Sequence, residues 1–159
     1  MDESPQYEVA TFAAGCFWDV EAEFRRLERV IGTMSGYSGG TIPEPDYELV
    51  SSGTTGHAEA VQVIFDPQQV SYDQLLDLFW SIHDPSQEQD ESTRSAIFYH
   101  SPEQRAMAEA SMDRLQKSGG RAILTGILPF ASFWKAEDCH QQYYEKCGQG
   151  YCISTNYWE

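Results

Sequence analysis

The sequence predicts a single α+β domain: a ferredoxin-like mixed sheet with flanking helices, followed by an irregular C-terminal tail. The chain has 159 residues, a length that suits one sizeable core. Short apolar runs of strand length are interspersed with segments of helical periodicity, and no linker or repeat separates them. The first segments follow the order strand, helix, strand, strand, helix, strand, as in a split βαβ arrangement. We therefore expect residues 1–159 to form one domain, in which residues 147–159 are a flexible tail that carries cysteines.

The first half of the chain supplies three strands, the first helix and a short helical turn. Residues 9–14 form an apolar run that is typical of a buried strand, and residues 20–24 follow as the body of a helix. Residues 30–38 are predicted as the second strand, which a glycine pair ends. Residues 47–50 are expected to form a helical turn after a loop rich in turn formers. Residues 57–66 alternate in polarity, which predicts the third strand.

The second half begins with a helix that has a signal at each end. Ser71 and Gln74 form a capping-box pattern, and Pro85 disfavours helix in the residue before it. The remaining predicted elements are an exposed polar loop (86–94), a strand (95–99), a helix that begins with Ser-Pro (101–118), a strand (121–128), an aromatic loop (129–134) and a final helix (137–146).

The charge balance excludes some classes of partner. The chain has 25 acidic and 10 basic residues, a formal net charge of -15. Such a surface repels phosphate backbones, so we expect no nucleic-acid partner. No segment is apolar for long enough to span a bilayer, and the acidic N-terminus lacks the apolar stretch of a secretory signal. We therefore expect a cytoplasmic monomer without a membrane partner.

The cysteines are placed unevenly, with Cys16 near the start and Cys139, Cys147 and Cys152 near the end. A disulfide-scaffolded secreted domain is smaller and more evenly cross-linked. In a reducing compartment, this distribution suggests redox work instead. Zinc binding by the three late cysteines and His140 is the alternative, but the close Cys-x-x-Cys pairs of recognisable zinc sites are missing.

Cys16 falls at the predicted turn from the first strand to the first helix, directly after Gly15. Unpaired backbone N–H groups and the positive end of the helix dipole favour a thiolate there, and the thiolate is the nucleophilic form. The alternative is a buried structural cysteine, which behaves as a small hydrophobic residue. The position alone leaves both interpretations open.

Glu59 shares its alternation with Val61, Val63 and Phe65 in the third predicted strand. Its side chain is therefore expected to point toward the core. Burial there raises the pKa of a carboxyl group, which makes it a proton donor near neutral pH. The alternative is a glutamate at a strand end that reaches solvent.

Three aromatic residues near these groups have two interpretations each. Phe17 and Trp18 either belong to the core or wall a small apolar pocket beside the Cys16 sulfur, and Tyr47 either packs or donates a phenolic hydrogen bond. Together, the thiol, the candidate acid and the distant thiols are typical of a thiol redox enzyme or a cysteine hydrolase. A hydrolase needs a general base beside the cysteine and has no use for tail thiols, so the sequence favours redox chemistry.

Several short motifs occur along the chain in a fixed order. They are Gly15-Cys16-Phe17-Trp18, Ser35-Gly36-Tyr37-Ser38-Gly39-Gly40, Ser52-Gly53-Thr54-Thr55-Gly56-His57-Ala58-Glu59-Ala60-Val61, His83-Asp84-Pro85, Leu128-Pro129 and His140-Gln141-Gln142-Tyr143-Tyr144. In this order they resemble the peptide methionine sulfoxide reductases of the A type, over nearly the whole chain. The first and third motifs are specific in combination, and neither would suffice alone.

The resemblance implies a thiol-dependent oxidoreductase that reduces the S epimer of methionine sulfoxide, free or in proteins, without a metal or a bound organic cofactor. At matching positions, Cys16 resembles the nucleophile, and Glu59 resembles the acid that protonates the departing oxygen. Phe17 and Trp18 match the pocket for the substrate methyl group. Tyr47 matches a tyrosine that hydrogen-bonds the sulfoxide oxygen.

The resemblance also implies how the oxidised enzyme is recycled. Cys16 would become a sulfenic acid, which a second thiol converts to a disulfide. Cys152 matches the tail position where many members keep this resolving thiol, and Cys147 would take a second exchange that passes the oxidation outward. Cys139 stands where a tyrosine is usual, and we expect it to be a structural thiol. Thioredoxin is the implied reductant.

Three features depart from the family pattern. Asp19 replaces a small residue, and its charge opposes a low thiol pKa unless the side chain points away or caps the helix. The loop 86–93 is shorter than usual; we expect Asp90 to keep the place of a substrate-binding aspartate, while Thr93 lies near where a second oxygen-binding tyrosine is missing. Ala14 replaces a glycine. The shortened loop and Asp19 favour, as the alternative function, a low-turnover binding module for oxidised methionine, whereas the change at Ala14 is minor.

Overall fold

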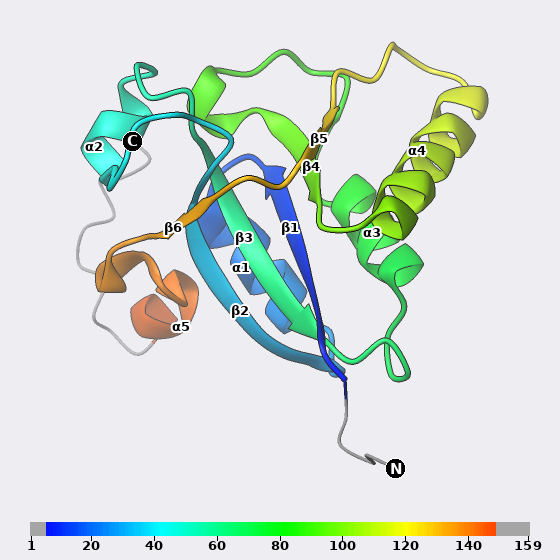
Figure 1. The fold of residues 1–159 in the computed structure, drawn as a ribbon, viewed down its shortest axis with the longest axis horizontal. Coiled ribbons are helices and arrows are strands. Elements are labelled where there is room, and N and C mark those ends of the chain that lie inside the picture. Colours follow the sequence, from blue (N-terminus) through cyan, green and yellow to red (C-terminus); the bar gives the residue numbers. More distant parts are fainter. Residues whose placement is uncertain (1–5, 149–159) are drawn as a thin grey trace.

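The structure, a computed structural model, describes residues 6–148, except for the side chains of residues 147 and 148. These residues form a six-stranded sheet in the order β5-β4-β1-β3-β2-β6, with helices packed around it (Figure 1). The strands are β1 (Glu8–Ala14), β2 (Val30–Ser38), β3 (Ala58–Phe65), β4 (Ser95–Tyr99), β5 (Gly126–Pro129) and β6 (Phe133–Lys135). The helices are α1 (Phe17–Arg25), α2 (Tyr47–Ser51), α3 (Tyr72–Ser81), α4 (Pro102–Lys117) and α5 (Tyr143–Gly148), with 3-10 turns η1 (Glu91–Thr93) and η2 (Asp138–His140).

The first four strands follow the predicted ferredoxin-like order. β3 lies between β1 and β2 and pairs antiparallel with both, and β4 pairs antiparallel with the other side of β1. β5 then adds parallel to β4, and β6 adds antiparallel to the free side of β2. The parallel pair makes the sheet mixed. The predicted fold class, an α+β domain with a mixed sheet and flanking helices, is therefore confirmed.

The sheet is buried on its helix side by large side chains and, over part of the opposite face, by smaller ones. On the helix side, large residues of β1 and β3 pack against α1 and α3, which contact each other. The opposite face carries a smaller cluster of Ala13, Ala58, Ala60, Ala96 and Phe98, packed against Phe130 and Phe133. Neighbouring residues of a strand point to opposite faces. Glu59, which follows Ala58, therefore faces the helix side together with Val61.

The turn from β1 into α1 has the predicted form. Gly15 has a φ of 100°, which glycine adopts without steric cost. Cys16 is the N-cap of α1, with φ -59° and ψ 122°. Val20 and Phe24 of the same helix are buried in the main core. Cys16 is thereby placed at the start of the helix, as the sequence predicts.

The predicted starts of α3 and α4 are confirmed. The Ser71 hydroxyl accepts the N–H of Gln74, and the Gln74 side chain accepts the N–H of Ser71, which completes the capping box. At α4, the Ser101 hydroxyl accepts the N–H of Gln104, whose side chain accepts the N–H of His100, and Pro102 lies in the first turn. At 16 residues, α4 is the longest helix described. None of the helices in residues 6–148 has both the length and the apolar character needed to cross a membrane.

The predicted strand over residues 121–128 is too long, and the strand β6 was not predicted. The N–H of Ile123 donates to the Gln116 side chain and that of Leu124 to the carbonyl of Pro85, so the ladder with β4 begins only at Gly126. β6 begins inside the predicted aromatic loop. Its pairing with β2 at Ser38 joins residues far apart in the chain, which local sequence patterns do not report.

The predicted final helix over residues 137–146 is also wrong in detail. It is divided into η2 and α5 because Gln142 has a φ of 51° and donates its N–H to Glu21. α5 ends at Gly148, so the first residues of the predicted tail are helical. The rest of that tail, including Cys152, lies outside the described residues. The predicted loop over residues 86–94 is mostly exposed but contains the turn η1.

Candidate active site

Cys16 is half-buried at the first turn of α1. Burial and the charge of Glu59 raise the pKa of its thiol to about 12, and the charge of Asp19 adds to the rise. The backbone N–H groups of Trp18 and Asp19 lower the pKa, as expected at a helix start, but by less. The lowered pKa that the position predicts is therefore wrong for the resting protein, which carries a neutral thiol.

Glu59 lies in β3 directly behind this turn and is 3% exposed. Its Oε1 accepts the backbone N–H of Phe17, the residue after Cys16, at 3.1 Å. Burial raises the pKa of the carboxyl group to about 7, although the Phe17 N–H lowers it, and the charge of Asp19 raises it further. The predicted direction of the side chain is confirmed, and the alternative of a strand-end glutamate in solvent is excluded. Glu59 is thus half-protonated near neutral pH.

Aromatic rings from three segments meet beside the start of α1. The indole of Trp18 lies on Tyr143 with centroids 3.9 Å apart, and its Nε1 donates to Nδ1 of His140 at 3.0 Å. The His140 ring stacks on Tyr47 at 4.5 Å, and Phe17 lies 6.1 Å from Tyr47. Phe17 and Trp18 are buried, whereas Tyr47 is partly exposed. The predicted aromatic residues are therefore brought together at one place.

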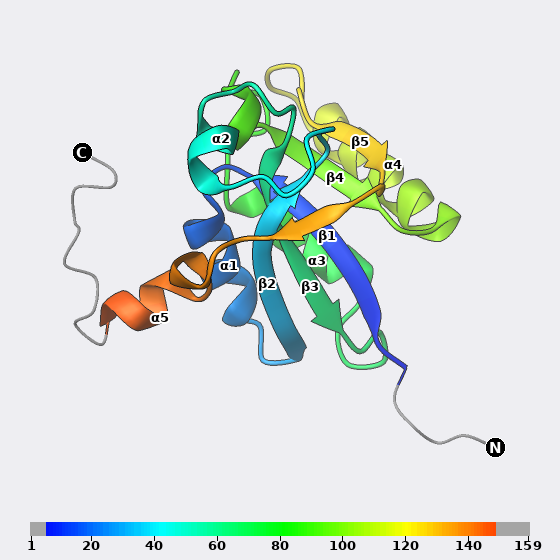
Figure 2. The same cartoon turned by 60° about the vertical axis from the view of Figure 1, so that its left-hand side comes forward.

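Two members of this cluster, His140 and Tyr143, were not predicted as site residues. The signal that marks them is their membership of the motif His140–Tyr144, but nothing in that motif indicates contact with Trp18. α5 lies beside α1 (Figure 2), and this approach brings both residues to the site. The pairing depends on the three-dimensional position of a C-terminal segment, which periodicity does not report.

Glu137, which was also not predicted as a site residue, links the backbone of Tyr47 to the sheet through two hydrogen bonds. Its Oε1 accepts the hydroxyl of Tyr37 at 2.7 Å, and its Oε2 accepts the N–H of Tyr47 at 3.1 Å. Burial, followed by the hydrogen bond to Glu137, raises the pKa of Tyr37 above its usual range. Tyr37 is fully buried and therefore serves as a fixed donor. This bridge holds the start of α2 at a set distance from β2.

The two aspartates named from the sequence lie at the surface. Asp19 is exposed and accepts the hydroxyl of Tyr144 at 2.5 Å, and it forms no side-chain cap on α1. Pointing away does not remove its effect on the pKa of Cys16. Asp90 is exposed just before η1. Among the contacts of residues 6–148, none links Asp90 to Cys16 or Glu59; the neighbouring Glu91 instead accepts the N–H of Gly56.

The zinc alternative has little support in the part of the chain that the structure describes. Cys139 is exposed, whereas His140 is buried with its Nδ1 already accepting the Trp18 N–H. No group of three or more metal-binding side chains occurs among these residues. Cys147 lies in α5, and Cys152 lies beyond the described residues.

Comparison with known proteins gives one consistent result. A family model described as peptide methionine sulfoxide reductase matches residues 8–157. A protein of Geobacter metallireducens named peptide methionine sulfoxide reductase MsrA is 52% identical over 160 residues, covering 96% of this chain and 99% of that protein. The crystal structure of reduced Mxr1 from Saccharomyces cerevisiae superimposes with a TM-score of 0.86 at 30% identity, covering 94% of this chain and 90% of the other. Mxr1 in complex with Trx2 superimposes with a TM-score of 0.65 at 27% identity, covering 89% and 87%.

Proposed function

The chain belongs to the peptide methionine sulfoxide reductase family, and on that premise we propose that Cys16 is the nucleophile with which it reduces methionine sulfoxide. The chain is an oxidoreductase, and thioredoxin recycles it. The observation that carries the assignment of Cys16 is its pairing with Glu59. A thiol at the start of α1 lies next to a buried carboxyl group whose pKa is about 7 and which accepts the N–H of the following residue.

The first step transfers oxygen from the substrate to Cys16. The Cys16 sulfur attacks the sulfoxide sulfur and forms a transient sulfur–sulfur bond. The sulfur–oxygen bond of the substrate then breaks as the protonated oxygen bonds to the Cys16 sulfur, and the sulfur–sulfur bond breaks so that methionine leaves. Cys16 is oxidised to a sulfenic acid while the substrate sulfur is reduced. The sulfur–oxygen bond of the substrate breaks only if its oxygen is protonated, and Glu59 delivers that proton from its buried position.

The proton inventory of this step balances within the pair. A thiol and a sulfoxide give a sulfenic acid and a thioether, so no proton is consumed overall. Because the pKa of Cys16 is about 12 and that of Glu59 about 7, the resting pair holds its proton on sulfur. The thiol proton therefore passes to Glu59 as the sulfur attacks, and Glu59 passes it to the oxygen. The reactive state of the pair is the one in which Cys16 and Glu59 together hold one proton.

The aromatic cluster supports a substrate pocket beside the sulfur. We assign Phe17 and Trp18 to the wall that contacts the substrate S-methyl group, and the Tyr47 hydroxyl to the sulfoxide oxygen. Buried rings that are fixed by Tyr143 and His140 give such a wall a set shape. We also propose that Asp90, in the surface loop, binds the substrate. A change in the KM of an Asp90→Asn variant would support this role. An unchanged KM would remove it from the site.

Recycling requires a second thiol, and we assign this role to the tail. The Cys152 thiol attacks the sulfur of the Cys16 sulfenic acid, a disulfide forms and water leaves. Cys147 then exchanges with this disulfide and moves it outward, where the thioredoxin dithiol reduces it. Gly148 and Gly150, which precede Cys152, suit a segment that has to reach α1.

One titration tests the assignment. The protein is reduced, freed of reductant and given one addition of methionine sulfoxide, and its free thiols are counted. The reductase predicts the loss of two thiols per chain with one methionine formed, and the S epimer alone should react. The second candidate, a binding module with little turnover, is favoured by the charge of Asp19, which raises the Cys16 pKa. No loss of thiols would support that module against the reductase.

We further propose that the protein works in the cytoplasm. Its cycle ends in a disulfide that a dithiol has to reduce, and a reducing compartment supplies that dithiol. Cell fractionation tests this, and recovery of the protein from an oxidising compartment would contradict it.

A further inference from the structure

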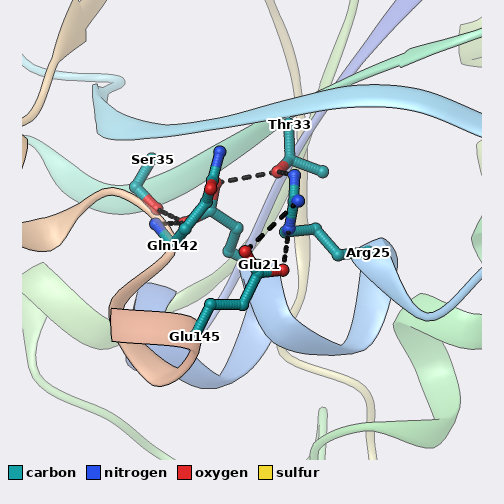
Figure 3. A network of polar contacts seen from close by, with 6 residues as sticks. All are labelled: Glu21, Arg25, Thr33, Ser35, Gln142 and Glu145. Carbon is teal, nitrogen blue, oxygen red and sulfur yellow. Dashed lines mark hydrogen bonds and ion pairs between the residues drawn. The ribbon is translucent and has the colours of Figure 1, made fainter. Parts of the chain in front are cut away.

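A second carboxyl group, Glu21, is buried in the middle of α1, and none of the steps above uses it. Its side chain is 1% exposed. Its Oε2 accepts the hydroxyl of Thr33 at 2.8 Å, and its Oε1 accepts the hydroxyl of Ser35 at 2.9 Å and the backbone N–H of Gln142 at 2.6 Å. Figure 3 shows these groups converging between α1, β2 and the C-terminal segment. A buried carboxylate is costly without such donors, so the contacts define its position.

Gln142 is the residue at which the C-terminal segment changes direction. Its φ of 51° is uncommon for a residue with a side chain, and α5 begins at the next residue. Just before it, the Gln141 side chain bonds the N–H and the carbonyl of Ser35 at 2.9 and 2.8 Å and the carbonyl of Ala136 at 3.0 Å. The chain up to Gln142 is therefore attached to β2, and the Glu21 contact fixes the start of α5.

Beyond Gln142, the Tyr143 ring stacks on Trp18, whereas the polar contacts of Glu145 and Tyr144 with α1 lie at the surface. Glu145 pairs with Arg25 at 2.6 Å, with side chains 50% and 30% exposed. Tyr144 donates to the exposed Asp19. Exposed pairs of this type contribute little because water and salt screen them. Glu21, by contrast, is a buried carboxyl group that bonds the residue before α5, and the hydrogen bond from Trp18 to His140 is a second buried polar contact between α1 and the C-terminal part of the chain.

We propose that Glu21 is a positioning residue for the disulfide-forming step. It anchors the start of α5 to the helix that carries Cys16, and so sets the place from which the tail thiols approach the oxidised sulfur. This inference rests on the proposed function, in which a tail thiol condenses with the Cys16 sulfenic acid and releases water. α5 carries Cys147 and leads to Cys152. Holding its start raises the effective concentration of the tail thiols at Cys16.

Two steps of a single turnover, measured separately, test the proposal. Methionine formation reports the attack by Cys16, and thiol loss after acid quench reports the disulfide. We expect Glu21→Ala to form methionine within about threefold of the wild-type rate and to form the disulfide at least about tenfold more slowly. The Cys16 sulfenic acid then accumulates, and dimedone traps it for mass spectrometry. Disulfide formation at the wild-type rate, or an equal loss in both steps, would overturn the proposal.

A conservative variant separates the hydrogen bond from mere packing. Glu21→Gln keeps an oxygen for the Gln142 N–H, and the Thr33 hydroxyl can rotate to accept the new amide. We expect its disulfide step to lie within about threefold of wild type. A Gln variant as slow as Glu21→Ala would overturn the role of this acceptor.

A further variant and a control keep the test decisive if Glu21→Ala does not fold. The double variant Thr33→Val/Ser35→Ala removes the hydroxyls that orient Glu21, and it should slow the disulfide step by at least about threefold with methionine formation unchanged. An unchanged disulfide step there would overturn the proposal. The matched control, Glu145→Gln, loses only the exposed ion pair and should keep both rates; a loss equal to that of Glu21→Ala would also overturn it. If the wild-type protein itself loses no second thiol, the proposed function fails, and this inference fails with it.

Discussion

At the scale of single residues, the proposed chemistry depends on two groups whose pKa values are both raised by burial. The Cys16 pKa is about 12 and the Glu59 pKa about 7. A site with a free thiolate would react with many electrophiles, whereas a neutral thiol reacts only where its proton has an acceptor. In the proposed mechanism, Glu59 is that acceptor, and the oxygen of the substrate is the next one. The pair therefore couples the reactivity of the sulfur to the presence of a sulfoxide.

Replacing the nucleophile should abolish the first step. We expect Cys16→Ser to form no detectable methionine in a single turnover, because an alcohol is a far weaker nucleophile than a thiol. Quenched-flow analysis of one addition of methionine sulfoxide measures this. Cys139→Ser, the same substitution at an exposed thiol, is the control and should react as wild type does. Normal turnover by Cys16→Ser would refute the assignment.

The pH dependence of the first step should report the shared proton. Below the Glu59 pKa of about 7, both groups of the pair are protonated and the reactive state is depleted. We expect the single-turnover rate to rise with pH up to about 7 and then to level, because the Cys16 pKa lies far higher.

Glu59→Gln should remove this inflection and slow methionine formation by about 10²–10⁴-fold. Glu48→Gln, which changes an exposed carboxyl group of α2, should alter neither the rate nor its pH dependence. A Glu59→Gln variant that keeps the wild-type profile would show that another group carries the proton.

The sequence predicted part of this site because the relevant signals are local. Cys16 follows a strand and starts a helix, and Glu59 alternates with apolar residues, so their placement follows from periodicity. The burial that dominates both pKa values does not follow, because it depends on what covers the residues. His140, Tyr143 and Glu137 reach the site from a distant segment, and no local pattern points to those contacts.

At the scale of elements, the predictions succeeded where residues close in sequence mark the ends of a strand or helix. β2 and β4 have the predicted bounds, with a glycine pair directly after β2, and α3 and α4 begin at side-chain caps. The errors concern β5, β6 and the divided final helix. In each, a hydrogen bond to a distant partner outweighs local propensity, as in the Gln142 N–H that Glu21 accepts.

Replacing the resolving thiol in the tail should affect the later turnovers but not the first. We expect Cys152→Ser to form one methionine per chain at the wild-type rate, because Cys16 is intact, and then to recycle poorly with thioredoxin. Methionine formation over successive additions of substrate measures this. Cys139→Ser is again the matched control. Full steady-state turnover by Cys152→Ser would instead assign the resolving role to Cys147 or to direct reduction of the sulfenic acid.

At the scale of the whole molecule, the active-site carboxyl group has a cost in stability. The pKa of Glu59 rises from a reference of 4.5 to about 7 in the folded protein. The folded protein therefore binds more protons than the unfolded chain within this window. The neutral Glu59 carboxyl group therefore makes a contribution to the free energy of unfolding that is fully present below pH 4.5. This contribution is lost as the pH rises through about 7, where the buried group ionises.

Glu59→Gln stays neutral at every pH and should avoid this loss. We expect the variant to unfold at a higher urea concentration than wild type near pH 8, by up to about 3 kcal/mol in the free energy of unfolding, and to differ less near pH 4.5. Urea titrations at both pH values measure the difference. Equal shifts at both would mean that the gain comes from packing rather than from the charge. Glu48→Gln should show no shift at either pH.

Helix α1 carries both the sulfur that is oxidised and the carboxylate that anchors α5, with Glu21 five residues after Cys16. Each residue of an α-helix adds about 100° of rotation and about 1.5 Å of rise. A shift of the whole helix would leave the angle between the two side chains unchanged. The deletion of one residue between them would turn Glu21 away from Ser35 while Cys16 stays at the end of β1. In the proposed cycle, the angular register of a single short helix therefore links the oxidising and the resolving halves.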